Sequence, residues 1–274
     1  MTIGYLADIE FVWGFQAKIV GLSKTSPSFY YPPPTTFLGS IAEVIAKENS
    51  LGEEKGRKII PAVSERILAL GVKPLNCIPI KYEDLNRVIA VKITGKTGLC
   101  PDPASLRSSF DSPAVGKTIF STFDENPPIL RYFLVLKDEK IEVDDIGLDL
   151  NEDVFWKIHR IGSKESLTSC KEIRKVDVEI VKEEAFTTYS FPLTENTIPV
   201  SEREGSWQRE TYINPLEIKT YLPIRDYIFG ENLATYLIPI RRYRIAEPEY
   251  HVKLANNFVA YAIGKEVVIG RWLK

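Results

Sequence analysis

The stretch Tyr30-Tyr31-Pro32-Pro33-Pro34-Thr35-Thr36-Phe37-Leu38-Gly39 joins a strand-like opening to an amphipathic helix and decides how the first part of the chain folds. Because proline fixes φ and lacks an N–H, we expect residues 32–34 to run extended. Thr35 or Thr36 can then cap the helix that follows. Its apolar face is predicted from the residues that recur at helical spacing, which are Phe37, Leu38, Ile41, Val44 and Ile45.

Two interpretations of this stiff corner stay open. A proline-braced crossover between a strand and a helix is the more ordinary one. The corner also suits holding a defined ligand, because Lys24, Tyr30 and Tyr31 lie beside it. A tyrosine ring can offer a stacking surface or simply pack into a core.

Composition indicates a globular chain of 274 residues, long enough for one large domain or two modest ones, with 44% hydrophobic and 26% charged residues. The opening residues lack the basic region of a signal peptide, and no charge-free stretch approaches membrane-spanning length. Cys77, Cys100 and Cys170 are scattered and form no CxxC pair. We therefore expect reduced thiols, a cytoplasmic location and no zinc site.

The net charge of −2 does not indicate a nucleic-acid-binding protein, but the charges are unevenly distributed along the chain. Residues 138–153 carry eight acids against one lysine, and residues 239–274 carry seven bases against three acids. Such asymmetry permits a local anionic ligand, although a charge run is more often a solvated face.

The order of predicted elements indicates an α+β fold. We expect a strand over 4–20, helices over 35–48, 61–70 (closed by Gly71) and 150–161 (capped by Asp149 or Asn151), and strands over 77–80, 87–93, 129–136 and 176–181. This order over residues 1–185 fits a ferredoxin-like β-α-β-β-α-β domain with an extra helix. Residues 186–274 hold six prolines and show no convincing helix, so they predict a smaller β-rich C-terminal domain.

Residues 94–128 are rich in glycine, proline and serine and show little periodicity, so we expect a long irregular loop that projects outward. Cations interleaved with aromatic rings on such a loop suit single-stranded nucleic acid. Alternatively, the aromatic residues pack back onto the core. The residues concerned are Lys92, Lys96, Arg107, Lys117, Phe110, Phe120 and Phe123.

The stretch Trp156-Lys157-Ile158-His159-Arg160-Ile161-Gly162-Ser163-Lys164-Glu165 predicts a helix that ends on a basic turn. Gly162 would free backbone N–H groups there, and Lys157, Arg160 and Lys164 could surround a phosphate. The alternative is an ordinary helix end, where glycine and cations are common. His159 is more often a packed or capping residue than a general acid or base.

Other kinds of site are poorly supported by the sequence. His159 and His251 have no second histidine or cysteine at metal-ligand spacing, and no nucleophile elbow, P-loop or dinucleotide fingerprint is present. We therefore expect no metal, no cofactor and no catalytic residues.

These features together resemble the Cas-five family of CRISPR-associated proteins, RAMP-type subunits of type I interference complexes (Cascade). Four features carry the resemblance. The first is the strand Gly4–Phe15 followed by the run Pro32-Pro33-Pro34-Thr35-Thr36-Phe37-Leu38-Gly39-Ser40-Ile41-Ala42, similar to the family's run into its first helix. The second is the insertion at 94–128 in the place of the family's thumb, and the third is the turn Arg160-Ile161-Gly162-Ser163-Lys164, similar to its glycine loop. The fourth is the small β-rich C-terminal part.

The resemblance implies a non-catalytic subunit that binds the 5′ handle of CRISPR RNA, caps the backbone filament and supports antiviral defence, and it favours subtype I-A. Its implied partners are the crRNA handle, the backbone subunit of the Cas-seven family and the large Cascade subunit, with no membrane. The protein would recognise the shape of the RNA and bind its backbone, while base pairing reads the target sequence. The implied RNA-binding residues are Lys24, Tyr30, Tyr31, Arg107, Phe110, Lys117, Lys157, Arg160, Ser163 and Lys164. We expect the turn and residues 94–128 to lie on the same side of the molecule.

Two alternatives remain. One branch of the family cuts precursor RNA with tyrosine, lysine and histidine side chains, so the chain could be a metal-independent endoribonuclease that uses His159. No lysine–histidine dyad is present to support this activity. The other alternative is a RAMP-like scaffold that contacts protein only.

Overall fold

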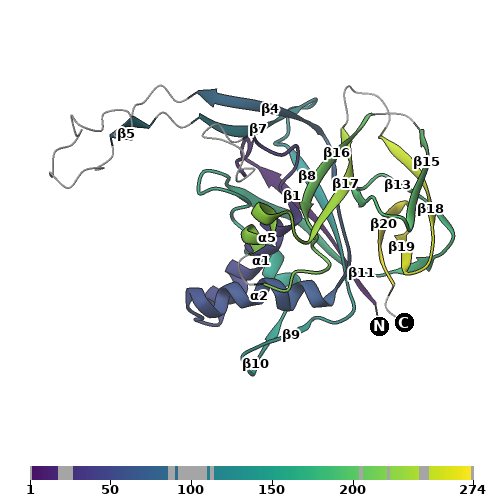
Figure 1. Ribbon diagram of the computed structural model, residues 1–274, viewed down its shortest axis with the longest axis horizontal. Coiled ribbons are helices and arrows are strands. Elements are labelled where there is room, and N and C mark those ends of the chain that lie inside the picture. Colours follow the sequence, from purple (N-terminus) through teal and green to yellow (C-terminus); the bar gives the residue numbers. More distant parts are fainter. Residues whose placement is uncertain are drawn as a thin grey trace.

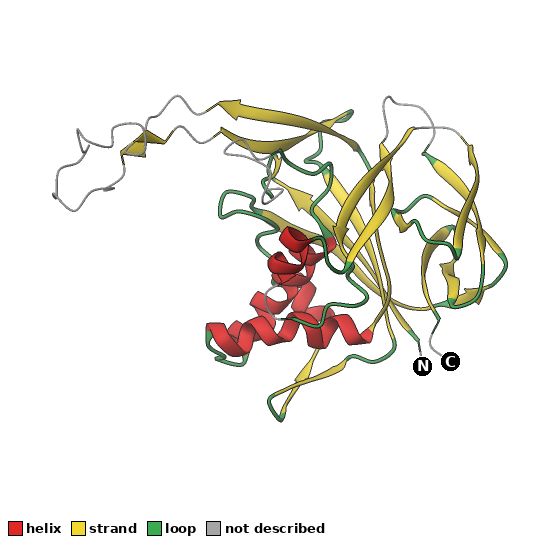
Figure 2. Cartoon of the chain, viewed as in Figure 1, coloured by secondary structure: helices red, strands yellow, loops and turns green. Residues whose placement is uncertain are grey.

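The computed structural model describes residues 2–17, 27–85, 90–91, 110–111, 114–203, 206–220, 223–240 and 247–272. An antiparallel seven-stranded sheet crosses the molecule, with the helices gathered on one side and much of the β-rich C-terminal part on the other (Figures 1 and 2). Some C-terminal residues, among them Tyr212 and Tyr236, belong to the core beneath the helices. The protein is therefore a mixed α/β structure made mostly of strands.

The strand order of the large sheet is β11-β1-β8-β3-β20-β19-β12. Its strands are β1 (Ile3–Phe11), β3 (Ile67–Pro74), β8 (Ile129–Leu136), β11 (Thr168–Asp177), β12 (Glu179–Val181), β19 (Phe258–Ile263) and β20 (Glu266–Arg271). In β1 the alternate residues Tyr5, Ala7 and Ile9 face the core shared with the helices, while Leu6 faces a second core on the C-terminal side. The sheet is thus covered on both faces, which explains why its central strands are almost continuously apolar.

The helices are α1 (Pro34–Glu48), α2 (Glu53–Arg66), α4 (Glu152–Trp156) and α5 (Pro223–Phe229). The expected apolar face of α1 is confirmed, but the helix begins at Pro34 without a side-chain cap, so the expected threonine cap is wrong. Proline suits the first helical position because its missing N–H would have no partner there. No helix within the described ranges is long and apolar enough to cross a membrane.

Three boundaries differ from expectation. The predicted helix over 61–70 ends at Arg66, because residues 67–74 are buried as strand β3 between β8 and β20. Helix α4 has the expected cap, Asn151, which accepts a hydrogen bond from the backbone N–H of Asp153, but it ends at Trp156 rather than Ile161. Helix α5 was not expected, because its seven residues are too few to show a period.

A β-ribbon forms an arm that extends away from the body (Figure 1). Its strands β4 (Cys77–Leu85) and β7 (Ala114–Thr122) pair along their whole length, and β2 (Gly14–Phe15) pairs with β7. Residues 114–122 are therefore a regular strand, not the irregular loop that we expected over 94–128. Of residues 87–93 and the rest of that loop, the structure describes β5 (Ala90–Val91), β6 (Phe110–Asp111) and the residues after 122.

The C-terminal part forms small sheets and then rejoins the large one. Strands β19 and β20 lie in the large sheet, where Gly270 pairs with Ala69 of β3. The predicted boundary at about residue 185 therefore does not separate these two strands from the first sheet. The remaining strands are β9 (Lys140–Val143), β10 (Ile146–Asp149), β13 (Glu184–Thr187), β14 (Phe191–Pro192), β15 (Thr197–Arg203), β16 (Ser206–Ile213), β17 (Leu233–Ile240) and β18 (Glu249–Leu254).

Candidate nucleic-acid interface

The two faces of the arm differ at its base. On one face, Thr118 and Phe120 are buried, and the Phe120 ring packs edge-on against Phe11 with 5.2 Å between centroids. Phe120 is therefore a core residue, not a stacking surface for bases. On the other face, the register pairs Ile80 with Ile119 and Tyr82 with Lys117, and the first three of these side chains are 40–54% exposed.

Strand β2 lies directly against this base. Gly14 pairs with Ile119, and the Phe120 N–H donates to the Trp13 carbonyl at 2.9 Å. Gly14 has φ +147°, and a Cβ there would lie 2.0 Å from the Thr118 carbonyl oxygen. Only glycine allows so close an approach between β2 and β7.

The predicted basic turn docks on the residues around β2. The Ser163 N–H donates to the Gln16 carbonyl at 3.0 Å, and the Gln16 N–H donates to Ser166 Oγ at 3.0 Å. Trp13 Nε1 donates to the Glu165 carbonyl at 2.9 Å. The structure thus places the turn and the base of the arm on the same side of the molecule.

Two of the predicted cations of this turn are directed to α1. Arg160 Nη2 donates to both carboxylate oxygens of Glu43, at 2.9 and 3.0 Å, and Lys157 pairs with Glu48. Burial opposes ionisation of Glu43, but hydrogen bonds from Lys47 and Arg160 outweigh it and lower its pKa. Lys157 and Arg160 therefore do not form the open ring of cations that we expected, because carboxylates of α1 pair with them, and their binding to RNA stays a prediction.

Lys164 differs from the other two cations of the turn. It is exposed at the tip of the turn, and no ion pair joins it to a carboxylate in the part of the chain that the structure describes. The Ser163 N–H, by contrast, is used by Gln16 and is not left open to a ligand. The hydrogen bond from Ser163, together with the charges of Lys164 and Lys117, lowers the pKa of Glu165.

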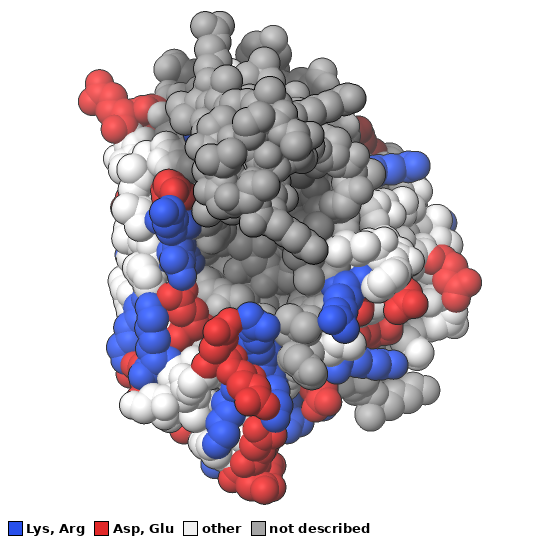
Figure 3. Space-filling model, turned by 60° about the vertical axis from the view of Figure 1, so that its left-hand side comes forward, with Lys and Arg blue, Asp and Glu red and all other residues white. Residues whose placement is uncertain are grey.

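The surface near the helices carries mixed charge. On the face drawn in Figure 3, described Lys and Arg side chains are interspersed with Asp and Glu and form no continuous basic patch. RNA binding there would depend on single cations and on shape rather than on a broad electrostatic field.

The two tyrosines of the proline run have different environments. Tyr31 is fully buried, its hydroxyl donates to the Pro239 carbonyl at 2.6 Å, and burial raises its pKa. The expected role of Tyr31 as a stacking surface for a base is therefore wrong, because its ring is not accessible. Tyr30 is half-buried, and Lys81 Nζ lies 3.8 Å above its ring and 2.6 Å from Glu210 Oε1. Tyr30 thus takes part in a cation–π contact at the base of the arm.

Replacing Tyr31 by phenylalanine should leave RNA affinity unchanged and lower the free energy of unfolding by about 1–2 kcal/mol, because the buried Pro239 carbonyl loses its donor. Urea unfolding and RNA titration of the same preparation measure both quantities. A loss of RNA affinity without a loss of stability would contradict the buried position.

Three further predicted RNA-binding residues, and His159, remain to be placed. Lys24 and Arg107 lie outside the described residues, and Phe110 is described only as the backbone partner of Val91 in β6. We expected His159 to be a packed or capping residue. It is 54% exposed, with Nε2 3.9 Å from Glu43 Oε1, so the packed alternative is wrong. Within the described ranges, no group of three or more His, Cys, Asp or Glu residues could hold a metal ion.

Sequence reasoning missed the residues that fix the turn, namely Trp13, Gln16 and Ser166. Trp13 and Gln16 lie about 150 positions from their partners in the turn, so these residues form no motif in the sequence. Only Gly14 and Gly162 carried a signal, since glycine often marks a close approach of two backbone segments.

Comparisons with known proteins agree on one group of relatives. No family model matches. The chain is 25% identical over 262 residues to "CRISPR system aCascade subunit Cas5 1" of Saccharolobus solfataricus, covering 94% of this chain and 95% of that protein. It is 23% identical to "CRISPR-associated protein Cas5 3" of the same organism, with the same coverage. The crystal structure of a CRISPR protein from Archaeoglobus fulgidus is 43% identical, has a TM-score of 0.72 and covers 98% of this chain and 99% of its own.

Proposed function

Because this chain belongs to the Cas5 (Cas-five) family of CRISPR-associated proteins, we propose that it is a non-catalytic subunit of a type I interference complex that binds the 5′ handle of crRNA. In this role it caps the backbone filament in the cytoplasm and supports antiviral defence. Its partners are the backbone subunit of the Cas-seven family and the large subunit. One observation carries the proposal: the turn with Lys164 and the base of the arm lie side by side through β2.

The chemistry of this side suits a single RNA strand. Lys164 offers an exposed charge to a phosphate, and the arm offers the exposed ring of Tyr82 beside Lys117. Bases stack on aromatic rings without regard to sequence, while cations follow the backbone. Such a surface would hold a handle by its shape and phosphates.

We also infer that the proposed subunit is built on a ferredoxin-like core. Four strands of the large sheet follow the order β11-β1-β8-β3, with α1 and α2 between β1 and β3 and α4 between β8 and β11. All their pairings are antiparallel, which supports the β-α-β-β-α-β arrangement.

Replacing Lys164 by alanine tests the site. Binding of handle RNA should weaken about fivefold, and the slope of log K against log salt should become less steep by about 0.7, as expected for the loss of one phosphate contact to a single strand. Fluorescence anisotropy of the full chain with a labelled handle RNA, over a series of salt concentrations, measures both quantities.

The matched control is Lys55→Ala on the exposed face of α2, which should change neither affinity nor slope. Equal affinities for wild type, Lys164→Ala and control would show that Lys164 does not contact RNA. A wild-type chain with no salt-dependent affinity for the handle would favour the protein-only scaffold.

The proposal also predicts that the chain does not cut RNA. His159 is exposed and its Nε2 lies 3.9 Å from the Glu43 carboxylate, while the two nearby cations, Lys157 and Arg160, pair with α1. Repeat RNA incubated with the purified chain in EDTA should stay intact. Products with 5′-hydroxyl and 2′,3′-cyclic phosphate ends that disappear in His159→Ala would establish the ribonuclease alternative instead.

A further inference from the structure

Residues Trp13–Gln16 touch both surfaces of the proposed RNA site. Toward the arm, the Trp13 carbonyl accepts the Phe120 N–H at 2.9 Å, and Gly14 and Phe15 pair with β7. Toward the turn, Trp13 Nε1 donates to the Glu165 carbonyl at 2.9 Å. Gln16 makes three further hydrogen bonds there, two through its backbone and a longer one of 3.4 Å in which its side-chain Oε1 accepts from Ser163 Oγ. A single residue, Trp13, therefore binds the arm with its backbone and the turn with its ring.

Trp13–Gln16 pack closely against both the arm and the turn. A Cβ on Gly14 would lie 2.0 Å from the Thr118 carbonyl oxygen, and a Cβ on Gly162 would lie 2.9 Å from the Gln16 carbonyl oxygen. Both glycines have positive φ, at +147° and +121°, where other residues are strained. Phe15 is fully buried, with its ring 5.7 Å from that of Phe120, so the segment is also anchored in the core.

Other described contacts between the turn and the arm are weaker. The charge of Lys117 acts on Glu165, but Glu165 is exposed, and attraction between exposed charges is screened by water and salt. The strongest direct contacts between the turn and the arm therefore run through Trp13–Gln16, while Arg160 and the Val12 N–H, which donates to the Leu167 carbonyl at 3.2 Å, hold the turn to the body.

We propose that Trp13–Gln16 form a clasp that positions the turn against the arm. The turn and the arm then form one rigid unit, and a single RNA strand contacts both of its surfaces. Trp13 and Ser166 are positioning residues in this clasp and need not touch RNA. The physical gain is preorganisation: two surfaces fixed in advance do not lose motional freedom when the strand binds the second of them. This inference rests on the proposed function for its RNA consequence, but the clasp itself can be tested without RNA.

The first experiment measures hydrogen exchange in the full-length chain without RNA. The double variant Trp13→Phe/Ser166→Ala removes the indole donor and the hydroxyl that accepts from Gln16 while leaving the backbone intact. Exchange of the Ser163 and Ser166 amides should rise at least about tenfold, as expected when hydrogen bonds that restrain a turn are lost. Amides of β8 should exchange as in wild type, which separates a local release from general unfolding. Trp156→Phe, on the exposed end of α4, is the matched control and should change nothing.

The second experiment measures RNA affinity in a double-mutant cycle. In the intact chain, the effects of Lys164→Ala on the turn and Tyr82→Ala on the arm on RNA affinity should be non-additive. The fold-loss of affinity in the double variant should differ from the product of the two single fold-losses by at least about threefold. In the Trp13→Phe/Ser166→Ala background the losses should multiply.

The outcomes separate the two proposals. Unchanged exchange at Ser163 and Ser166 in the double variant would overturn the clasp, whatever the RNA data show. Additive losses in the intact chain would overturn the rigid unit. A wild-type chain without affinity for the handle would overturn the proposed function, while the exchange data would still decide the clasp.

Discussion

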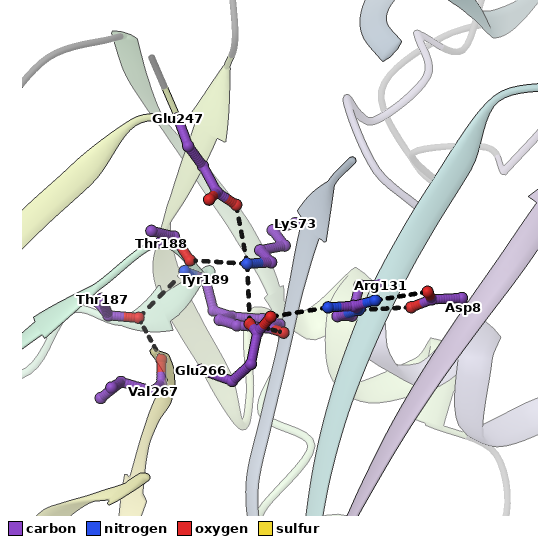
Figure 4. A network of polar contacts seen from close by, with 9 residues as sticks. All are labelled: Asp8, Lys73, Arg131, Thr187, Thr188, Tyr189, Glu247, Glu266 and Val267. Carbon is purple, nitrogen blue, oxygen red and sulfur yellow. Dashed lines mark hydrogen bonds and ion pairs between the residues drawn. The ribbon is translucent and has the colours of Figure 1, made fainter. Parts of the chain in front are cut away.

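Replacing Arg131 by methionine is expected to lower the free energy of unfolding by about 3–5 kcal/mol, because it removes the central cation of a buried ionic network. Arg131 Nε and Nη2 donate to the two oxygens of Asp8 at 2.5 and 2.6 Å, and Nη1 donates to Glu266 Oε1 at 2.7 Å (Figure 4). The side chains of Arg131 and Asp8 are only 15% and 8% exposed. Methionine fills a similar volume but leaves the Asp8 carboxylate without its cation.

The network crosses four neighbouring strands, which is why its loss should affect the whole sheet. The register places Asp8 of β1 and Lys73 of β3 on either side of Arg131 in β8. Glu266 of β20 bridges the two cations, since its second oxygen lies 2.8 Å from Lys73 Nζ and accepts from the Tyr189 hydroxyl at 2.6 Å. Each of the four neighbouring strands β1, β8, β3 and β20 thus contributes one charged residue to the network.

The effect of this substitution should depend on pH. Burial opposes ionisation of Glu266, but hydrogen bonds from Lys73 and Tyr189 and the charges of Lys73 and Arg131 lower its pKa below the ordinary 4.5. A carboxylate with a lowered pKa in the folded state stabilises the fold above its unfolded pKa, and this contribution is lost as pH falls through the folded value. The difference between wild type and Arg131→Met should therefore shrink below about pH 4.

Urea unfolding followed by circular dichroism measures both quantities. The control is Arg57→Met, which removes an exposed ion pair to Glu53 in α2 and should cost no more than about 0.5 kcal/mol. Equal losses for Arg131→Met and Arg57→Met would show that the network does not support the sheet.

Replacing Gly270 by alanine is the second large effect, and we expect a loss of about 3–5 kcal/mol. A Cβ at this position would lie 2.1 Å from the Leu68 carbonyl oxygen and 2.5 Å from the Ala69 Cβ, so β20 would be forced away from β3. The neighbouring Arg271 guanidinium donates to the carbonyls of Ser64 and Leu216, and these bonds would be strained as well.

Gly147→Ala in β10 is the matched control, because no atom lies within 4 Å of the Cβ it would add. Thermal unfolding should separate the two variants, with the midpoint of Gly270→Ala lower by about 10 °C or more. A Gly270→Ala protein with the wild-type midpoint would mean that the C-terminal strands do not contribute to the large sheet.

The sequence was informative where local pattern and tertiary environment agree. The helical spacing from Phe37 to Ile45 predicted the buried face of α1, and the apolar run 129–136 predicted β8. Asp149 and Asn151 were the two candidate caps of α4, and the structure uses Asn151. It was misleading at residues 67–70, whose spacing continues the helical period of α2 although pairing with β8 makes them strand. Burial between two layers overrides a periodicity that short segments share.

By itself the sequence determined the apolar segments, the helix start at the proline run and the presence of a basic turn, because these depend on neighbouring residues. Tertiary structure alone decided that Tyr31 is buried, that Glu43 and Glu48 neutralise Arg160 and Lys157, and that β20 closes the large sheet against β3. Each of these depends on residues far apart in the chain. The distances between these residues are set only when the sheet and the helices pack together. Electrostatic and packing energies depend on those distances in space and not on separation in the sequence.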